Sequence, residues 1–136
     1  MKRVLAAVLL LALTLSCSVV FAEVPQPRAS ELIVDRFIYA YAYGDGEIEF
    51  AMDMTTLMTV EKLGFPSIKI QEKRGSSWTT VKTVTDKYGY NRINYSYSGP
   101  YSGTAGNQYR VIVEYYAKDG DISDTKPKTS SALTAK

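Results

Sequence analysis

The chain has 136 residues, of which 16 are Lys or Arg and 14 are Asp or Glu, with one cysteine and no histidine. Without histidine, neither a Ser-His-Asp nor a Cys-His nucleophilic site can form, and histidine zinc sites are excluded. We therefore expect no enzyme and no cofactor, and the near balance of charge argues against nucleic acid as a partner.

The first 22 residues have the pattern of a cleavable secretory signal. Two basic residues precede an apolar stretch over residues 4–15, and small residues, Val20 and Ala22, stand at −3 and −1 of a cleavage site. The apolar stretch is shorter than the roughly 20 residues that a membrane-spanning helix needs. We expect cleavage after Ala22, secretion, and no transmembrane anchor in the mature form.

Cys17 leaves a second possibility for processing open. Ser16 is the small residue that lipoprotein processing needs before the cysteine, although the usual aliphatic residue at −3 is missing. The alternative to release is therefore a lipoprotein anchored at Cys17. Cleavage after Ala22 instead leaves 114 residues without cysteine, which is enough for one domain.

Charge is unevenly distributed along the mature chain. Residues 23–60 hold 2 basic and 7 acidic side chains, whereas residues 61–136 hold 12 basic and 7 acidic ones. The two segments are expected to interleave in a sandwich, so mutual neutralisation across neighbouring strands is favoured over a functional basic face.

The first part of the mature chain predicts a leader followed by a hairpin. Two prolines in residues 23–31 favour an extended leader, and a single domain is expected over residues 32–133. Residues 32–43 are partly apolar on both alternating faces, so the inward face of this strand stays open. A glycine-rich turn at 44–46 then leads into residues 47–54, which alternate strictly.

The rest of the chain predicts further strands. The period of two is lost over residues 55–64, which favours a helical turn or a covered loop ending at Gly64. Strand patterns with glycine turns between them follow at 67–73, 78–85, 88–97, 108–117 and 122–133, and residues 134–136 are expected to fray. About seven strands and no long helix predict an all-β fold, and a β-sandwich fits the length better than a barrel.

Two stretches resemble fibronectin type III domains. Residues 109–123 resemble their sixth strand and the turn after it, with Tyr109, Val111, Val113, Tyr115, Ala117, Gly120 and Ser123 at the matching positions. Residues 68–81, which include Trp78, resemble their third strand, hairpin and fourth strand. The resemblance implies an immunoglobulin-like Greek-key β-sandwich of about seven strands, with structural roles for Trp78 and Tyr109. The Tyr109 hydroxyl would bond back to the loop before its strand.

The overall layout also resembles a family of small secreted clostridial-type proteins of unknown function, which implies no activity. It combines the signal, one domain, Lys62-Leu63-Gly64 before the Ile-x-Ile strand, and tyrosines and glycines spaced over residues 95–109.

Two groups of carboxylates are candidates for chemistry. Glu47 and Glu49 share one face of a strand, which could suit glycoside cleavage, although a solvated strand surface is favoured. Asp119 and Asp121 have the spacing of the first ligands of a calcium loop, but Asp124 stands where that loop requires glycine. A plain hairpin turn is therefore favoured over a metal site there.

Tyrosine is unusually abundant, with 11 residues in the chain. The candidate ligand-binding group is a cluster of five of them: Tyr88, Tyr90, Tyr95, Tyr97 and Tyr101. Such rings can stack on sugars or anchor a protein partner, or they can simply fill the edge of a core. We expect a secreted, non-enzymatic binding or surface-interaction module, with a glycan or a cell-surface protein as candidate partner. The alternatives are a small carbohydrate-active enzyme that uses surface carboxylates, and a structural component that assembles through edge strands.

Overall fold

The computed structural model describes residues 31–136, and all of its regular structure is β-strand. The predictions for the signal, Cys17, cleavage at Ala22 and most of the leader fall on residues 1–30 and lie outside the described residues. Within residues 31–136 there is no helix of sufficient length and hydropathy to cross a membrane. Six strands form one antiparallel sheet: β1 (Ile33–Gly44), β2 (Glu47–Arg74), β3 (Ser77–Ser102), β4 (Gln108–Asp119), β5 (Ile122–Thr129) and β6 (Leu133–Thr134).

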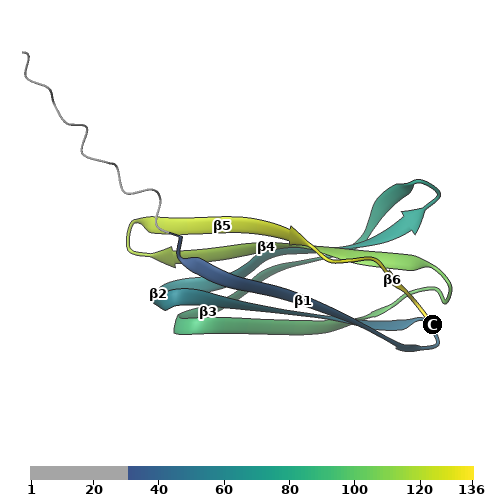
Figure 1. The fold of residues 1–136 in the computed structure, drawn as a ribbon, viewed down its shortest axis with the longest axis horizontal. Helices are drawn as coiled ribbons and strands as arrows, with labels where there is room; N and C mark the ends of the chain where they lie inside the picture. The colour runs from purple at the N-terminus through teal and green to yellow at the C-terminus, as the bar shows by residue number, and fades with distance from the viewer. Residues whose placement is uncertain (1–30) are drawn as a thin grey trace, which may run out of the picture.

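The sheet is curled, and the long strands β2 and β3 run through both of its halves (Figure 1). In the first half, residues 47–55 of β2 pair with β1 on one side and with residues 94–102 of β3 on the other. In the second half, residues 60–74 of β2 pair with β4 and with residues 77–92 of β3, and β5 extends this half beyond β4. We call these the β1 half and the β4 half.

The segment between Thr55 and Val60 forms neither the predicted helical turn nor the predicted covered loop. It stays extended within β2, but its pairing with β3 lapses between these two residues. The Thr56 hydroxyl lies 2.8 Å from the carbonyl oxygen of Met58 and 2.9 Å from that of Ile93. The period of two is lost because the strand passes from one half of the sheet to the other here, so helical spacing was the wrong interpretation.

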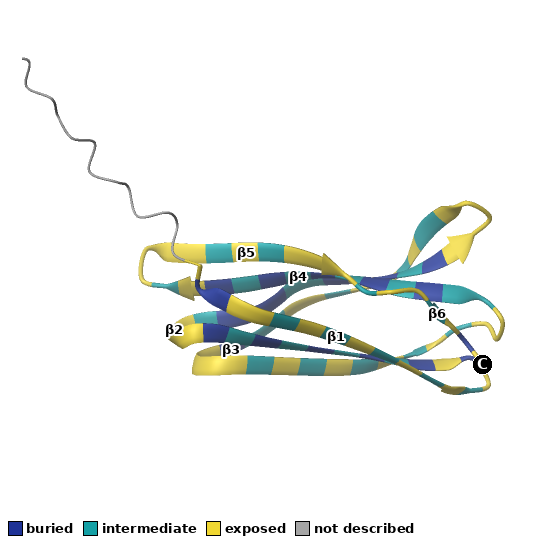
Figure 2. Ribbon diagram, in the orientation of Figure 1, coloured by how far each residue is buried: buried dark blue, intermediate teal, exposed yellow. Residues whose placement is uncertain are grey.

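The core lies between the two halves. Alternate residues of β2 and β4 fill it, and Figure 2 shows the resulting bands of burial along β4. Phe65 packs against rings from both halves, with its ring centroid 5.6 Å from that of Tyr95 and 5.3 Å from that of Tyr115. Burial raises the pKa of the Tyr115 hydroxyl, which donates to the carbonyl of Phe37 at 2.8 Å.

The C-terminal residues are held in place, in contrast to the predicted frayed tail. The backbone amide of Gly46 donates to the carbonyl of Lys136 at 2.7 Å, and Ala135 exchanges bonds with Asn107 and Gly106. Ala135 is only 2% exposed. The polar composition of the segment suggested fraying, but its backbone groups bridge the β1–β2 turn and the loop before β4.

Candidate functional site

Alternation along β1 places a row of aromatic side chains on its outer side. Phe37, Tyr39, Tyr41 and Tyr43 are 47%, 42%, 50% and 67% exposed. Successive outward residues of a strand lie about 7 Å apart, and the ring centroids of Phe37 and Tyr39 are 6.3 Å apart at an interplanar angle of 16°. Four large rings in line on solvent are more than isolated surface apolar residues, which need no explanation.

The inward side of β1 carries alanine where its cross-strand neighbours on β2 are bulky core residues. Ala40 pairs with Phe50, and Ala42 pairs with Ile48. Both Phe50 and Ile48 are 1% exposed. These large side chains lie beside the two alanines on the core side, and the tyrosines occupy the other side. This assigns the inward face that the sequence pattern left open.

Acidic and hydroxyl side chains continue the same outer surface across β2 and β3. Asp53 pairs with Phe37, Glu49 with Tyr41 and Glu47 with Gly44, and their partners on β3 include Ser96 and Ser102. The surface, which we call the acidic aromatic face, comprises Asp35, Phe37, Tyr39, Tyr41, Tyr43, Glu47, Glu49 and Asp53. Within the paired residues 35–55 and 94–102, its outward positions include no lysine or arginine.

Polar contacts organise this face. The Tyr43 hydroxyl donates to Glu49 Oε2 at 2.8 Å, and this bond to the carboxylate raises the pKa of Tyr43. The hydroxyl of Ser102 donates to Glu47. At the far end of the row, Lys128 Nζ from β5 lies 5.6 Å from the centroid of the Phe37 ring. Carboxylates beside ring faces form a surface that attracts cations and that also offers acceptors to hydroxyl-rich ligands.

The opposite surface of the molecule, on the β4 half, has the reverse charge. Outward residues of β2 and β4 alternate with the buried ones and define what we call the basic face: Lys62, Lys69, Lys73, Arg110 and Lys118, with Glu114 as its acidic member. Three of its rings are half-buried: Trp78, Tyr88 and Tyr116. The acidic and basic segments thus lie on opposite outer faces, so the predicted neutralisation across neighbouring strands is wrong for these residues.

Two cations of the basic face lie over aromatic rings. Lys62 Nζ lies 3.8 Å from the centroid of Tyr88, and the guanidinium of Arg110 lies 4.4 Å from that of Trp78. Arg110 Nε also donates to Gln71 at 2.8 Å. Trp78, for which the resemblance implies a structural role, therefore supports an arginine on the outer surface and is only partly buried.

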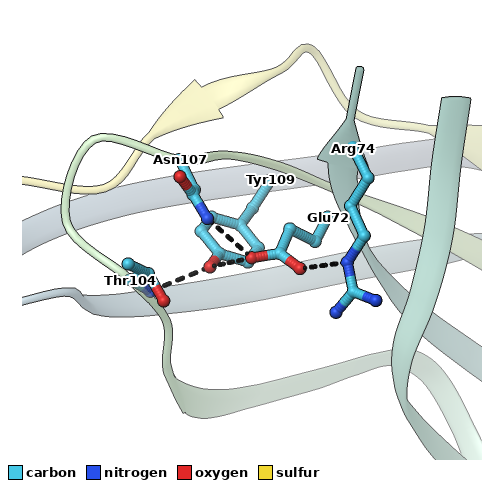
Figure 3. Close-up of polar contacts among 5 residues, drawn as sticks. All are labelled: Glu72, Arg74, Thr104, Asn107 and Tyr109. Carbon is cyan, nitrogen blue, oxygen red and sulfur yellow. Dashed lines mark hydrogen bonds and ion pairs between the residues drawn. The ribbon is translucent and has the colours of Figure 1, made fainter. Parts of the chain in front are cut away.

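A second polar cluster surrounds the carboxylate of Glu72 (Figure 3). Its Oε1 accepts from Asn107 at 2.8 Å and from the Tyr109 hydroxyl at 2.9 Å, while Arg74 Nε lies 2.8 Å from Oε2. These donors, Asn107 first, lower the pKa of Glu72. The Tyr109 hydroxyl in turn accepts from the backbone amide of Thr104 at 2.8 Å, in the loop before β4. Every group is already paired, so this cluster holds a loop in place and presents no free chemistry.

The predicted tyrosine cluster does not lie on one surface. Tyr95, Tyr97 and Tyr101 point inward and pack against the core. Tyr90 is 58% exposed, whereas Tyr88 is half-buried against Lys62. Burial raises the pKa values of Tyr88 and Tyr101. The crowding in sequence hides a division between the core, which takes three of these rings, and the outer side of the β4 half, which carries Tyr88 and Tyr90.

The candidate metal ligands also separate. Asp124 Oδ2 accepts from the backbone amide of Ile33 at 3.1 Å and lies 3.5 Å from Lys126 Nζ, so it faces β1 rather than the turn. Asp119 pairs with Ile122 across the β4–β5 turn, where Asp121 is exposed. Across residues 31–136, no three acidic, histidine or cysteine residues are grouped so that they could hold a metal ion.

Sequence reasoning missed the aromatic row and Glu72, although both left a signal. The row occupies every second position from Phe37 to Tyr43, and the alternate set contains two alanines. The pattern Ile68-x-Ile70-x-Glu72 places a carboxylate in line with two core residues. A carboxylate at a core position requires hydrogen-bond donors, and this requirement predicts a cluster there.

No protein-family model matches the chain, and no curated protein matches it.

Proposed function

We propose that this protein is a secreted, non-enzymatic binding module whose binding surface is the acidic aromatic face. The observation that carries the proposal is the row of four exposed rings on β1 beside Glu47, Glu49 and Asp53. Tyrosine rings provide large contact area at low cost in side-chain entropy, and adjacent acceptors orient what they bind. A glycan or a cell-surface protein is the class of ligand that such a surface suits.

Binding is favoured over catalysis because the carboxylates lie on an open outer surface. Glu47 is exposed and Glu49 is half-exposed, each engaged by a neighbouring hydroxyl. Hydrolysis benefits from a site that encloses its substrate and excludes water. A crevice between the halves, lined by Phe50, Ile68 and Tyr97 among others, has a volume of about 20 Å³, which is room for a single water.

We also propose that the fold is fibronectin type III-like, an immunoglobulin-like Greek-key sandwich. In support, the seven paired segments group as β1 with residues 47–55 and 94–102, and residues 77–92 with 60–74, β4 and β5. The bond from the Thr104 amide to the Tyr109 hydroxyl also supports it. An experimental structure with different strand neighbours would contradict this assignment.

The test of function compares one pair of tyrosines in the row with a single tyrosine outside it. The double variant Tyr39→Ser, Tyr41→Ser removes the centre of the row, and Tyr90→Ser removes an exposed tyrosine from the β4 half. Each protein is applied to a glycan array and to immobilised cell-envelope extract. We expect wild type and Tyr90→Ser to be retained. The double variant should lose at least about tenfold in affinity, because a tenfold change corresponds to about 1.4 kcal/mol, which is the size of one aromatic contact. If the wild type bound in neither assay, that result would contradict the proposal of an external ligand.

A further inference from the structure

We propose that copies of this chain associate with one another, the acidic aromatic face of one copy docking on the basic face of the next. The inference rests on the binding role proposed for the acidic aromatic face and names a second copy as its occupant. Its test uses purified protein alone, so failure to self-associate is measured separately from failure to bind an external ligand.

Two surfaces of the same molecule are complementary in charge. The acidic aromatic face carries four carboxylates, Asp35, Glu47, Glu49 and Asp53, at outward positions of its paired residues. The basic face carries five cationic side chains and one carboxylate, that of Glu114. Each face repels its own kind, so a face-to-face pair of identical surfaces is disfavoured and contact between unlike faces is favoured.

The two faces also offer complementary groups for contacts between rings and cations. Lys128 already lies over the Phe37 ring within one copy, 5.6 Å from its centroid. The neighbouring rings, Tyr39 and Tyr41, are exposed, and within residues 31–136 no lysine or arginine lies over either of them. The basic face offers exposed lysines, Lys69 and Lys73, at outward positions of β2. Cations placed over exposed rings contribute roughly 0.5–1 kcal/mol each.

The dimensions indicate a weak contact. The outward part of the β1 half spans three strands about 4.8 Å apart and nine positions of β1, or roughly 30 by 14 Å. A footprint of about 400 Å² per copy is at the low end for specific interfaces. Because the two surfaces differ and lie on opposite sides of the molecule, the contact is heterologous and repeats from copy to copy. We therefore expect concentration-dependent, salt-sensitive chains of copies.

The first experiment is sedimentation velocity of the purified protein, expressed with its native N-terminal segment, over a range of concentrations. At about 0.01 M salt, where the Debye length is about 30 Å, we expect the weight-average sedimentation coefficient to rise with concentration. At about 1 M salt the Debye length is about 3 Å, and we expect the monomer value throughout. A concentration-independent monomer at low salt overturns the proposal.

The second experiment exchanges the charges of the two faces. One variant carries Glu49→Lys and Asp53→Lys, and the other carries Lys69→Glu and Lys73→Glu. Each variant alone keeps one charged face, while the formal charges of its altered face cancel, so it is expected to stay monomeric at low salt. In an equimolar mixture, the intact basic face of the first variant can meet the intact acidic face of the second, so association into pairs is expected to return.

The mixture also controls for folding, since unfolded variants would not restore a salt-sensitive assembly. Asp121→Lys is the matched control, because Asp121 is exposed at the β4–β5 turn outside both faces. It should associate like the wild type. Undiminished association of either double variant, or a mixture that stays monomeric, would overturn the pairing of these two faces.

Discussion

Tyr109 and Glu72 connect three separate segments through one side-chain cluster. Glu72 belongs to β2 and Tyr109 to β4, while Thr104 and Asn107 lie in the loop between β3 and β4. Tyr109 is 1% exposed, so its hydroxyl has no access to water as a substitute partner. Buried polar groups of this kind stabilise the fold only as long as every member remains paired.

Replacing Tyr109 by Phe tests that cluster. The change leaves the Thr104 amide without its acceptor and removes one donor from Glu72, so we expect a loss of about 1–3 kcal/mol in the free energy of unfolding. Urea denaturation measures it. Tyr116→Phe, in a half-exposed position on the same strand, should change stability by less than about 0.5 kcal/mol. Equal losses in the two variants would contradict the assigned role.

Acidification tests the same carboxylate in a second way. The pKa of Glu72 in the folded protein lies below its ordinary value of 4.5, so its ionised form stabilises the fold above pH 4.5. That contribution is lost as the pH falls through the lowered pKa. Glu72→Gln should therefore be less stable at neutral pH and should lose less stability on acidification, in denaturation series at several pH values. Parallel pH profiles for wild type and variant would contradict this.

At the scale of elements, Gly64 allows β2 to pass closely beside β3. Its φ is 152°, and a Cβ added there would lie 2.0 Å from the carbonyl oxygen of Lys87. We expect Gly64→Ala to force the two strands apart and to lower the melting temperature strongly, in a thermal scan followed by circular dichroism. Gly99→Ala is the control, since its Cβ would meet its nearest neighbour, the Tyr97 hydroxyl, at 3.3 Å. A similar small shift for both would show that β2 does not need glycine there.

The all-β class and most strand positions follow from local patterns. Strict alternation over residues 47–54 and 108–117 and glycines at the turns predict those strands, and the structure confirms an all-β, antiparallel chain. The joining of neighbouring predicted strands into β2 and β3 does not follow, because it depends on which partner each segment meets across the curled sheet. Local pattern reports the period of a segment and not its neighbours.

The acidic aromatic face was hard to predict for a related reason. The outward side of β1 is more aromatic than its inward side, which reverses the usual rule that the larger apolar face is buried. Ala40 and Ala42 lie beside Phe50 and Ile48 on the core side, and which side of β1 faces the core is a tertiary effect. Counting tyrosines along the sequence pointed instead to residues 88–101, most of which face the core or its edge.

Over the whole molecule, charge is separated between two outer faces. The acidic first part of the chain lies on the β1 half, and basic residues of the remainder lie on the outward positions of the β4 half. Interleaving was expected to mix them, but only residues 94–102 of β3 enter the β1 half, and these carry no charged side chain. The molecule therefore has opposite charge on its two sides, although residues 23–136 carry equal numbers of basic and acidic side chains, 14 of each.

The measurement that tests this account most directly is carbodiimide cross-linking of an equimolar mixture of ¹⁴N- and ¹⁵N-labelled protein at low salt. Lys69 and Glu49 lie at outward positions on opposite faces, so a zero-length link between them forms only between copies. The account predicts mixed-isotope peptides that join Lys69 or Lys73 to Glu47, Glu49 or Asp53. Mixed-isotope links confined to other surfaces, or none at all, would contradict it.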